Sequence, residues 1–367
     1  MNNYNCSFIH LINNDSLTMN REHNYNVSFL RNQSHQTLIN LYKQYHQHNF
    51  NDNPIKIDQS YYNKIKIVIY TPPLNDLCGG VMVLYDLIQK INNINDNIIG
   101  LIYAYDHKEY PNNFCNNFFN PFWMDDNTVV IYPETITGNP LNAKYVIRWI
   151  LLDLGLEVSH DHYINWNKDD IVYHWEPSFL KNTKQLVNIW INPIIKNYQQ
   201  QERNINCYAF KKMQWIPQTL NQTEIQYYHT TQDINLDKVS VAEAVDVFNR
   251  SKLFYCYDPN TFFSIMAPLC GCVTVLHPLN NLTKKEYFRS RILCHPDGFC
   301  YDAGIAYGNS SDQIRMAIES VNEAQDQFDY LCELYKNTVN ILIKDITNMV
   351  NNKIFPINTV KNIYYSH

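Results

Sequence analysis

The chain has 367 residues, of which 45% are hydrophobic and 14% aromatic, and its formal net charge is −6. This length suits two α/β domains better than one, and the apolar content is enough for a large core. The negative balance argues against a general nucleic-acid-binding protein, and no stretch approaches the ~20 apolar residues of a membrane span. The abundance of Asn, Ile, Lys and Tyr, whose codons are AT-rich, favours the genome of a protist or a large DNA virus.

Residues 1–60 are polar and weakly periodic, and we interpret them as an N-terminal extension of the first domain. They lack the basic region and the apolar run of a signal peptide. The ten cysteines are scattered without CxxC pairs, which favours reduced thiols over a disulfide framework. These features predict a cytoplasmic protein, located in the host cytoplasm if the chain is viral.

From residue 64 the pattern changes to alternating strands and helices, which predicts a parallel sheet with helices on both faces. We assign residues 61–195 to a first Rossmann-like domain. The expected strands are Ile65–Tyr70, Ile98–Tyr103, Thr128–Tyr132, Ile171–His174 and Leu186–Trp190, and the expected helices are Val81–Ile91 and Leu141–Leu152.

The pair Gly79-Gly80 is informative because the whole chain contains only nine glycines. It follows the first expected strand and a loop with Asp76, and it precedes the first expected helix. Such a junction presents backbone N–H groups and the positive end of a helix dipole, which suits an anionic or polyhydroxylated ligand. Alternatively, the glycines only let the helix pack close to the strand.

A polar stretch at residues 197–204 marks an inter-domain linker. We assign 196–350 to a second Rossmann-like domain and 351–367 to a tail. Ser240 and Glu243 form a predicted capping box. The expected strands are Asn206–Phe210, Gln226–His229, Leu253–Tyr257 and Val273–Leu276, and the expected helices are Val241–Asn249, Thr261–Leu269, Ser311–Val321 and Asp326–Met349.

The segment after Leu253–Tyr257 is the second informative motif. Asp258 is expected to cap the following helix, with Pro259 in its first turn. Thr261 and Ser264 lie one turn apart, so their hydroxyls and the free N–H groups are expected to form a cradle for a diphosphate. The alternative is an ordinary crossover in which Asp258 and Thr261 only cap.

Three segments in order resemble GT-B glycosyltransferases: the Gly79-Gly80 loop, Val130–Trp149 and Ser251–Val275. The second is similar to a YPE…GNP…VVRW signature of a bacterial and viral branch of these proteins. The resemblance spans residues from about 64 to 350. It implies an α/β fold of two Rossmann-like domains whose parallel sheets face a central cleft. It also implies that residues 61–195 are on the acceptor side and that 196–350 bind the nucleotide-sugar donor. The glutamate pair of many retaining members is missing around Asp258, which leaves retention or inversion open.

The resemblance also implies roles for individual residues. Donor-binding residues are Gly79, Gly80, Lys211, Lys212, Tyr257, Asp258, Thr261 and Ser264. The Thr261 and Ser264 helix end, with Lys211 or Lys212, would stabilise the departing diphosphate. Asp76 and Glu134 are candidate catalytic bases. Acceptor or cleft residues are Asn139, Arg148 on the helix Leu141–Leu152, and Trp175; Arg148 can instead pair with Glu134.

We expect no metal and no cofactor, because no Asp-x-Asp is evident and the pair His160 and His162 lacks a third ligand nearby. The predicted function is transfer of a sugar from a UDP-, GDP- or dTDP-linked donor to a carbohydrate, lipid-linked or protein acceptor, in surface glycan synthesis. The alternative is a non-catalytic GT-B-like binding or interaction protein. The donor base, the acceptor and the oligomeric state stay open.

Overall fold

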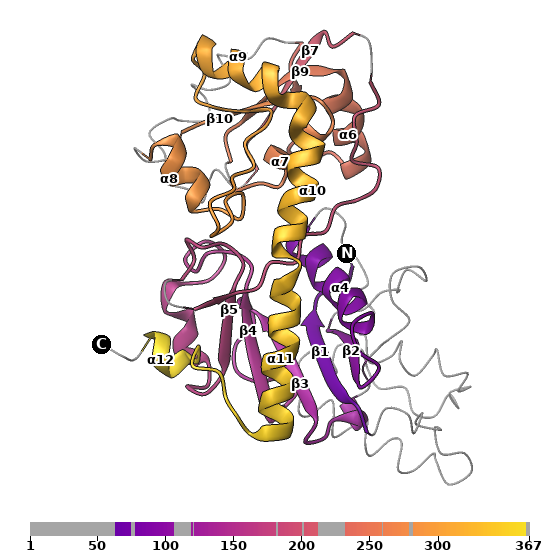
Figure 1. Cartoon of the computed structure of the whole chain (residues 1–367), viewed down its shortest axis with the longest axis vertical. Coiled ribbons are helices and arrows are strands. Elements are labelled where there is room, and N and C mark those ends of the chain that lie inside the picture. The colour runs from indigo at the N-terminus through magenta and orange to yellow at the C-terminus, as the bar shows by residue number, and fades with distance from the viewer. Residues whose placement is uncertain are drawn as a thin grey trace, which may run out of the picture. The chain divides into compact units, whose positions relative to one another are not determined.

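The computed structural model describes residues 63–74, 78–105, 119, 121–180, 183–199, 202–211, 232–258, 260–278 and 282–364. These residues form two compact units (Figure 1). Unit 1 contains the described residues up to Trp175 together with Phe179–Asn188 and the chain from Thr338 onward, whereas unit 2 contains Glu176–Ser178 and Ile189–Asn337. The structure therefore divides the chain differently from the predicted boundary at 195/196, and residues 338–350 belong to unit 1.

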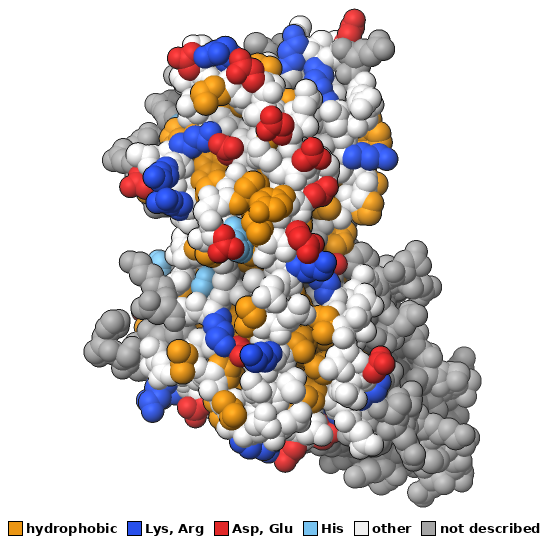
Figure 2. Space-filling model, viewed as in Figure 1, with side chains coloured by type: hydrophobic (Ala, Val, Ile, Leu, Met, Phe, Trp, Pro, Cys, Tyr) orange, Lys and Arg blue, Asp and Glu red, His pale blue; other side chains and the backbone are white. Residues whose placement is uncertain are grey.

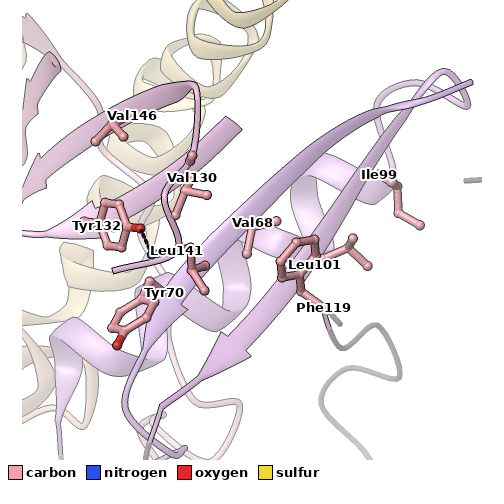
Figure 3. Packing of buried hydrophobic residues seen from close by; sticks show 10 residues of the cluster. Val68, Tyr70, Ile99, Leu101, Phe119, Val130, Tyr132, Leu141 and Val146 are labelled. Carbon is pink, nitrogen blue, oxygen red and sulfur yellow. Dashed lines mark hydrogen bonds between the residues drawn. The ribbon is translucent and has the colours of Figure 1, made fainter. Parts of the chain in front are cut away.

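Unit 1 is built on a six-stranded sheet in the order β2-β1-β3-β4-β5-β6, in which every neighbouring pair is parallel. The central strands are buried along their whole length, as expected for a parallel sheet that is covered on both faces. Figure 3 shows one of the resulting cores, in which Val68 and Val130 of neighbouring strands pack with Leu101 and Phe119. The strands are β1 (Ile65–Thr71), β2 (Ile98–Ala104), β3 (Thr128–Pro133), β4 (Tyr145–Ile150), β5 (Ile171–His174) and β6 (Lys184–Gln185), and the helices are α4 (Gly79–Asn92), α11 (Asn337–Asn352), α12 (Val360–Tyr364) and the 3-10 turns η3 (Pro121–Trp123) and η4 (His160–Asn165).

Two predicted elements of unit 1 are wrong. The expected helix Leu141–Leu152 is strand β4, which lies between β3 and β5. All six of its residues are buried, and its β-branched and aromatic side chains suit a sheet covered on both faces. The expected strand Leu186–Trp190 is also absent: the short strand β6 precedes it, and Val187 instead exchanges hydrogen bonds with the Thr338 hydroxyl.

Unit 2 contains a five-stranded parallel sheet in the order β11-β10-β9-β7-β8. The predicted capping box of Ser240 and Glu243 is confirmed. The single long C-terminal helix is instead two helices, interrupted at Lys336, and the expected strand Gln226–His229 lies outside the described residues. The strands are β7 (Ile205–Ala209), β8 (Ile234–Asn235), β9 (Ser251–Cys256), β10 (Val273–Leu276) and β11 (Ile305–Tyr307), and the helices are α6 (Val241–Arg250), α7 (Phe263–Leu269), α8 (Lys284–Arg289), α9 (Ser311–Ser320), α10 (Ala324–Tyr335) and the 3-10 turn η6 (Val321–Glu323).

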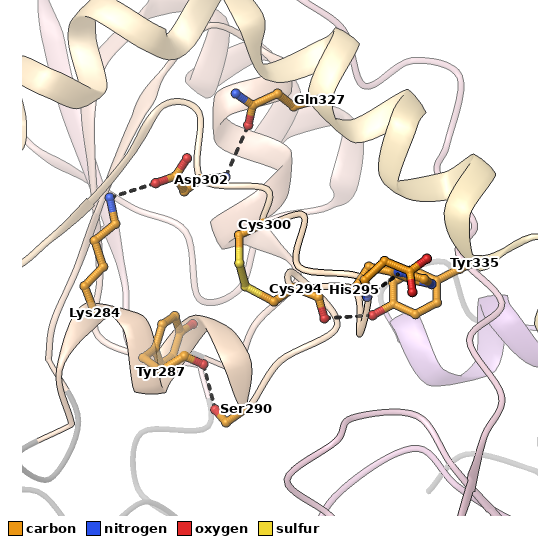
Figure 4. Close-up of a disulfide and its surroundings, with 10 residues drawn as sticks. Lys284, Tyr287, Ser290, Cys294, His295, Cys300, Asp302, Gln327 and Tyr335 are labelled. Carbon is orange, nitrogen blue, oxygen red and sulfur yellow. Dashed lines mark hydrogen bonds and ion pairs between the residues drawn. A yellow bond between two sulfur atoms is a disulfide. The ribbon is translucent and has the colours of Figure 1, made fainter.

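Unit 2 also contains a disulfide, Cys294–Cys300, which corrects the expectation of reduced thiols alone (Figure 4). Two short antiparallel contacts, from Tyr301 N–H to Leu293 O and from His295 N–H to Phe299 O, fold this loop back on itself and bring the two cysteines opposite each other. Spacing alone could not reveal this pairing. Among the described residues, no helix has the length and apolar character needed to cross a bilayer.

Candidate functional site

The Gly79-Gly80 pair forms the start of α4, directly after the loop that leaves β1. The residue before it, Cys78, makes no side-chain capping bond, and the N–H groups of the two glycines donate to no other described residue. A Cβ built on Gly79 would meet no atom within 4 Å, and one on Gly80 would meet only Leu151 Cδ1, at 3.9 Å. The structure gives no support to the alternative that close packing requires these glycines.

Glu134 follows β3 at the same carboxyl edge of the sheet. Its side chain is 5% exposed, and Oε2 accepts a hydrogen bond from Leu151 N–H at 2.9 Å. Leu151 is also the nearest neighbour of Gly80, so Glu134 supports the backbone beside the start of α4. The other candidate base, Asp76, lies outside the described residues.

Arg148 is placed in strand β4 and not on a helix, and its side chain is 0% exposed. Nε and Nη2 both lie 2.8 Å from Asp170 Oδ2, while Nη1 donates to Ile136 O at 3.0 Å. Nη2 also donates to Gly138 O. Burial lowers the pKa of Arg148, and the Asp170 carboxylate opposes this shift. Because all its nitrogens have partners inside unit 1, Arg148 is a structural residue, and its partner is Asp170 and not Glu134.

Asn139 is occupied in a similar way. Its Oδ1 accepts from Tyr132 Oη at 2.9 Å and from Ala143 N–H at 3.0 Å, and its Nδ2 donates to Ala143 O at 2.7 Å. The GNP segment is therefore a loop held by bonds within itself and to Tyr132 and Arg148 of the neighbouring strands. Trp175 is half-buried, with its ring 6.1 Å from that of Trp149.

In unit 2, Lys211 is the second residue after β7, at the carboxyl edge of the sheet. Its Nζ lies 4.1 Å from the centre of the Phe263 ring and donates to Asp237 O at 3.2 Å. The side chain of Asp237 accepts from the N–H groups of Phe210 and Lys211, at 2.7 and 2.8 Å, and so holds the chain as it leaves β7. Burial lowers the pKa of Lys211, opposed by the carboxylates of Asp237 and Asp258. Lys212 lies outside the described residues.

Aromatic side chains lie along the same edge. Tyr257 stacks on Phe210 with ring centres 5.3 Å apart, and its ring lies 5.9 Å from that of His277, which follows β10. Tyr208 packs edge-on against Phe210 at 5.5 Å. Sequence reasoning missed His277, although its place directly after a strand was a usable signal. Burial lowers the pKa of this half-buried imidazole.

The turn after β9 differs from the expected cradle. Asp258 is 0% exposed and caps the turn and not the helix, because its Oδ1 accepts from Asn260 N–H at 2.9 Å. The helix begins only at Phe263, and Thr261 Oγ1 accepts from its N–H at 3.4 Å. Ser264 is 2% exposed and donates its hydroxyl to Thr261 O at 2.8 Å. Most of the backbone N–H groups that were expected to be free for a diphosphate therefore donate to acceptors within the turn.

A buried ion pair holds this turn from behind. Arg291 donates from Nε to Glu176 Oε1 at 2.8 Å and from Nη1 to Asn260 Oδ1 at 2.7 Å. Glu176 also accepts from Ile292 N–H. Burial raises the pKa of Glu176, and Arg291 opposes the rise. Sequence reasoning missed Arg291, because 115 residues separate it from its carboxylate partner.

No group of three metal-ligating side chains occurs in the part of the chain that the structure describes. No family model and no curated protein matches this chain. Among solved structures it is similar to an alpha-glucosyltransferase in complex with UDP and a 13-mer DNA (10% identity, 78% of this chain and 99% of that chain, TM-score 0.42). It is also similar to a sucrose-phosphate synthase from Thermosynechococcus elongatus (9%, 78% and 98%, 0.40) and to an O-GlcNAc transferase mutant from Thermobaculum terrenum (8%, 80% and 70%, 0.42). These scores are low, so a function for this chain has to come from its own residues.

Proposed function

We propose that the protein is a glycosyltransferase that binds a nucleoside diphosphate sugar and needs no metal. The observation that carries the proposal is the carboxyl edge of the unit 2 sheet. There half-buried Lys211 lies over the Phe263 ring, and Tyr257 stacks between Phe210 and His277 along the same edge. Ligands of open parallel sheets bind at this edge. A fixed cation next to aromatic rings suits a ligand with a diphosphate and a planar base.

In this proposal Lys211, with Lys212, neutralises the charge that develops on the departing diphosphate. Partial burial strengthens this interaction because water screens it less. Tyr257 and His277 contact the base. Asp258 and Ser264 act through the turn and keep Thr261 in place for the ligand.

Unit 1 supplies the acceptor side. The open N–H groups of Gly79 and Gly80 suit a hydroxyl-rich or anionic group, because the helix dipole adds positive potential there. Asp76 is the proposed base. Glu134 keeps the neighbouring backbone in position, because its carboxylate is buried and already bonded to Leu151 N–H.

A thermal-shift screen of the full chain against UDP, GDP and dTDP tests the binding step, since a ligand that binds only the folded state raises the melting temperature. The proposal expects one diphosphate to stabilise the protein at concentrations well above its Kd, by roughly 2 to 3 kcal/mol at a hundredfold excess. No response to any of the three would contradict it.

Turnover separates the enzyme from a non-catalytic binding protein. The corresponding nucleotide sugar, incubated with a panel of carbohydrate acceptors, is expected to release diphosphate, and Asp76→Asn is expected to slow release by about a hundredfold or more without weakening diphosphate binding. Tight binding without release from any common donor would support the binding-protein alternative instead.

A further inference from the structure

Residues 353–359 connect α11 to α12 (Figure 1). This connection exposes three large apolar side chains. Ile354, Phe355 and Ile357 are 60%, 52% and 81% exposed. Isolated apolar side chains on a surface need no explanation, but three within four positions mark a site of interaction. Ile357 is more exposed than any other large hydrophobic side chain that the structure describes.

The backbone of this connection is held firmly against unit 1. Lys353 Nζ donates to Tyr145 Oη at 2.9 Å, and the ring of Phe355 lies 6.2 Å from that of Tyr145. Asn358 is 2% exposed, and its side chain donates to Val172 O at 2.6 Å. Because both ends of the connection are bonded to the sheet, the apolar side chains between them are presented outward by a fixed backbone.

Lysines flank the apolar side chains. Lys353 and Lys361 are exposed, and no described carboxylate lies within ion-pair distance of either. A third lysine, Lys144, lies over the same Tyr145 ring as Lys353, each at 5.5 Å, but it pairs with Asp126 at 2.9 Å. On the face of unit 1 that Figure 2 shows, hydrophobic side chains lie among Lys and Arg side chains, with Asp and Glu side chains between them. This basic stretch stands out in a chain whose net charge is −6.

We propose that the segment Lys353–Lys361 is a peripheral contact with an anionic lipid surface, in which Ile354, Phe355 and Ile357 enter the interface and the lysines meet the headgroups. Apolar side chains combined with lysines suit binding to the plane of such a membrane. A second copy of this chain fits less well, because a two-fold contact through this segment would bring the same lysines together.

The position of the segment also restricts the geometry of docking. Tyr145 is the first residue of β4, so the segment lies at the amino end of the unit 1 sheet, whereas Gly79 follows the carboxyl end of β1. A six-residue strand is roughly 20 Å long. Lipid docking would thus leave the carboxyl edge of this sheet about that distance from the headgroups, within reach of an extended acceptor.

Flotation of the full chain with vesicles of phosphatidylcholine, with and without phosphatidylserine, tests the proposal. We expect about tenfold stronger partitioning onto the vesicles that contain phosphatidylserine, and loss of that gain at high salt. Equal or absent binding to the two kinds of vesicle would overturn the assignment of an anionic surface.

Two variants locate the contact. I354S/F355S/I357S is expected to reduce partitioning at least about tenfold while the protein stays folded, because more than half of each side chain is exposed and only Phe355 packs on Tyr145. The matched control M316S/I318S removes two apolar side chains that are 52% and 54% exposed on α9, and it should bind as the wild type does. Retained binding of the triple variant would overturn the proposal. A second result would also overturn it: the wild type does not bind vesicles, and sedimentation shows that it forms a dimer that the triple variant does not form.

Discussion

The two units use similar residue types to different ends. Each has a buried arginine paired with a carboxylate, Arg148 with Asp170 in unit 1 and Arg291 with Glu176 in unit 2. Arg148 gives its remaining donors to the carbonyls of Ile136 and Gly138, in the loop between β3 and β4. Arg291 gives one to Asn260, in the turn beside Asp258. A buried arginine in an ion pair therefore does not by itself indicate a ligand site. The segment that accepts its remaining hydrogen bonds decides whether it supports one.

The largest expected effect comes from breaking the unit 1 pair. Arg148→Met leaves the Asp170 carboxylate buried without its partner and should reduce the free energy of unfolding by about 3 to 5 kcal/mol. Urea denaturation measures this loss. Nucleotide affinity of the folded fraction should not change, and a weaker affinity would mean that this arginine belongs to the ligand site.

A pH titration of stability tests how burial affects the histidine at the carboxyl edge of the unit 1 sheet. His174 ends β5 in unit 1 and is 6% exposed, and burial lowers its pKa from 6.5 to about 4. The unfolded chain therefore binds the proton more readily, so His174 stabilises the fold above pH 6.5, and this contribution is lost as the pH falls towards 4. The loss amounts to roughly 3 kcal/mol. In His174→Phe, urea denaturation at several pH values should show a correspondingly flatter pH dependence. The same slope in the wild type and the variant would refute this account.

Asn260→Ala tests the unit 2 half of the comparison. It removes the contact with Arg291 Nη1 and leaves the pair with Glu176 intact. Because the turn loses its support, affinity for the nucleoside diphosphate should fall about fivefold to tenfold, roughly 1 to 1.4 kcal/mol, as measured by calorimetry. The matched control is Asn139→Ala in the unit 1 loop, which should lower stability and leave affinity unchanged. If both variants bind the diphosphate equally well, the loops held by the two buried arginines do not differ in the way described.

The smallest expected effect is on the stability of Gly79→Ala. A Cβ at this position meets open space and the backbone has no positive φ, so the free energy of unfolding should stay the same or rise by up to about 1 kcal/mol. Turnover should fall, because the methyl group occupies the space beside the open N–H groups. A clear loss of stability would restore the packing explanation for this glycine.

Local signals in the sequence were enough to predict β1, the start of α4 and the capping box of Ser240, because each depends on residues close together in the chain. Strand β4 was missed since it is buried on both faces and shows no alternation. The position of Lys211 near a strand end could be predicted from the sequence. Its hydrogen bond to the Asp237 side chain could not, because 26 residues separate the two. The Ser264 hydroxyl was misjudged for a different reason: whether it points outward or into its own turn depends on backbone geometry that spacing does not reveal.

Calorimetric titration of the best-binding nucleoside diphosphate into Lys211→Met and Lys252→Met tests the central claim most directly. Lys252 is an exposed lysine in β9 of the same unit, so the two variants lose the same charge from different places. The account predicts at least about tenfold weaker binding for Lys211→Met, or 1.4 kcal/mol, and wild-type affinity for Lys252→Met. Equal affinities in the two variants would contradict the assignment of Lys211 to a diphosphate site.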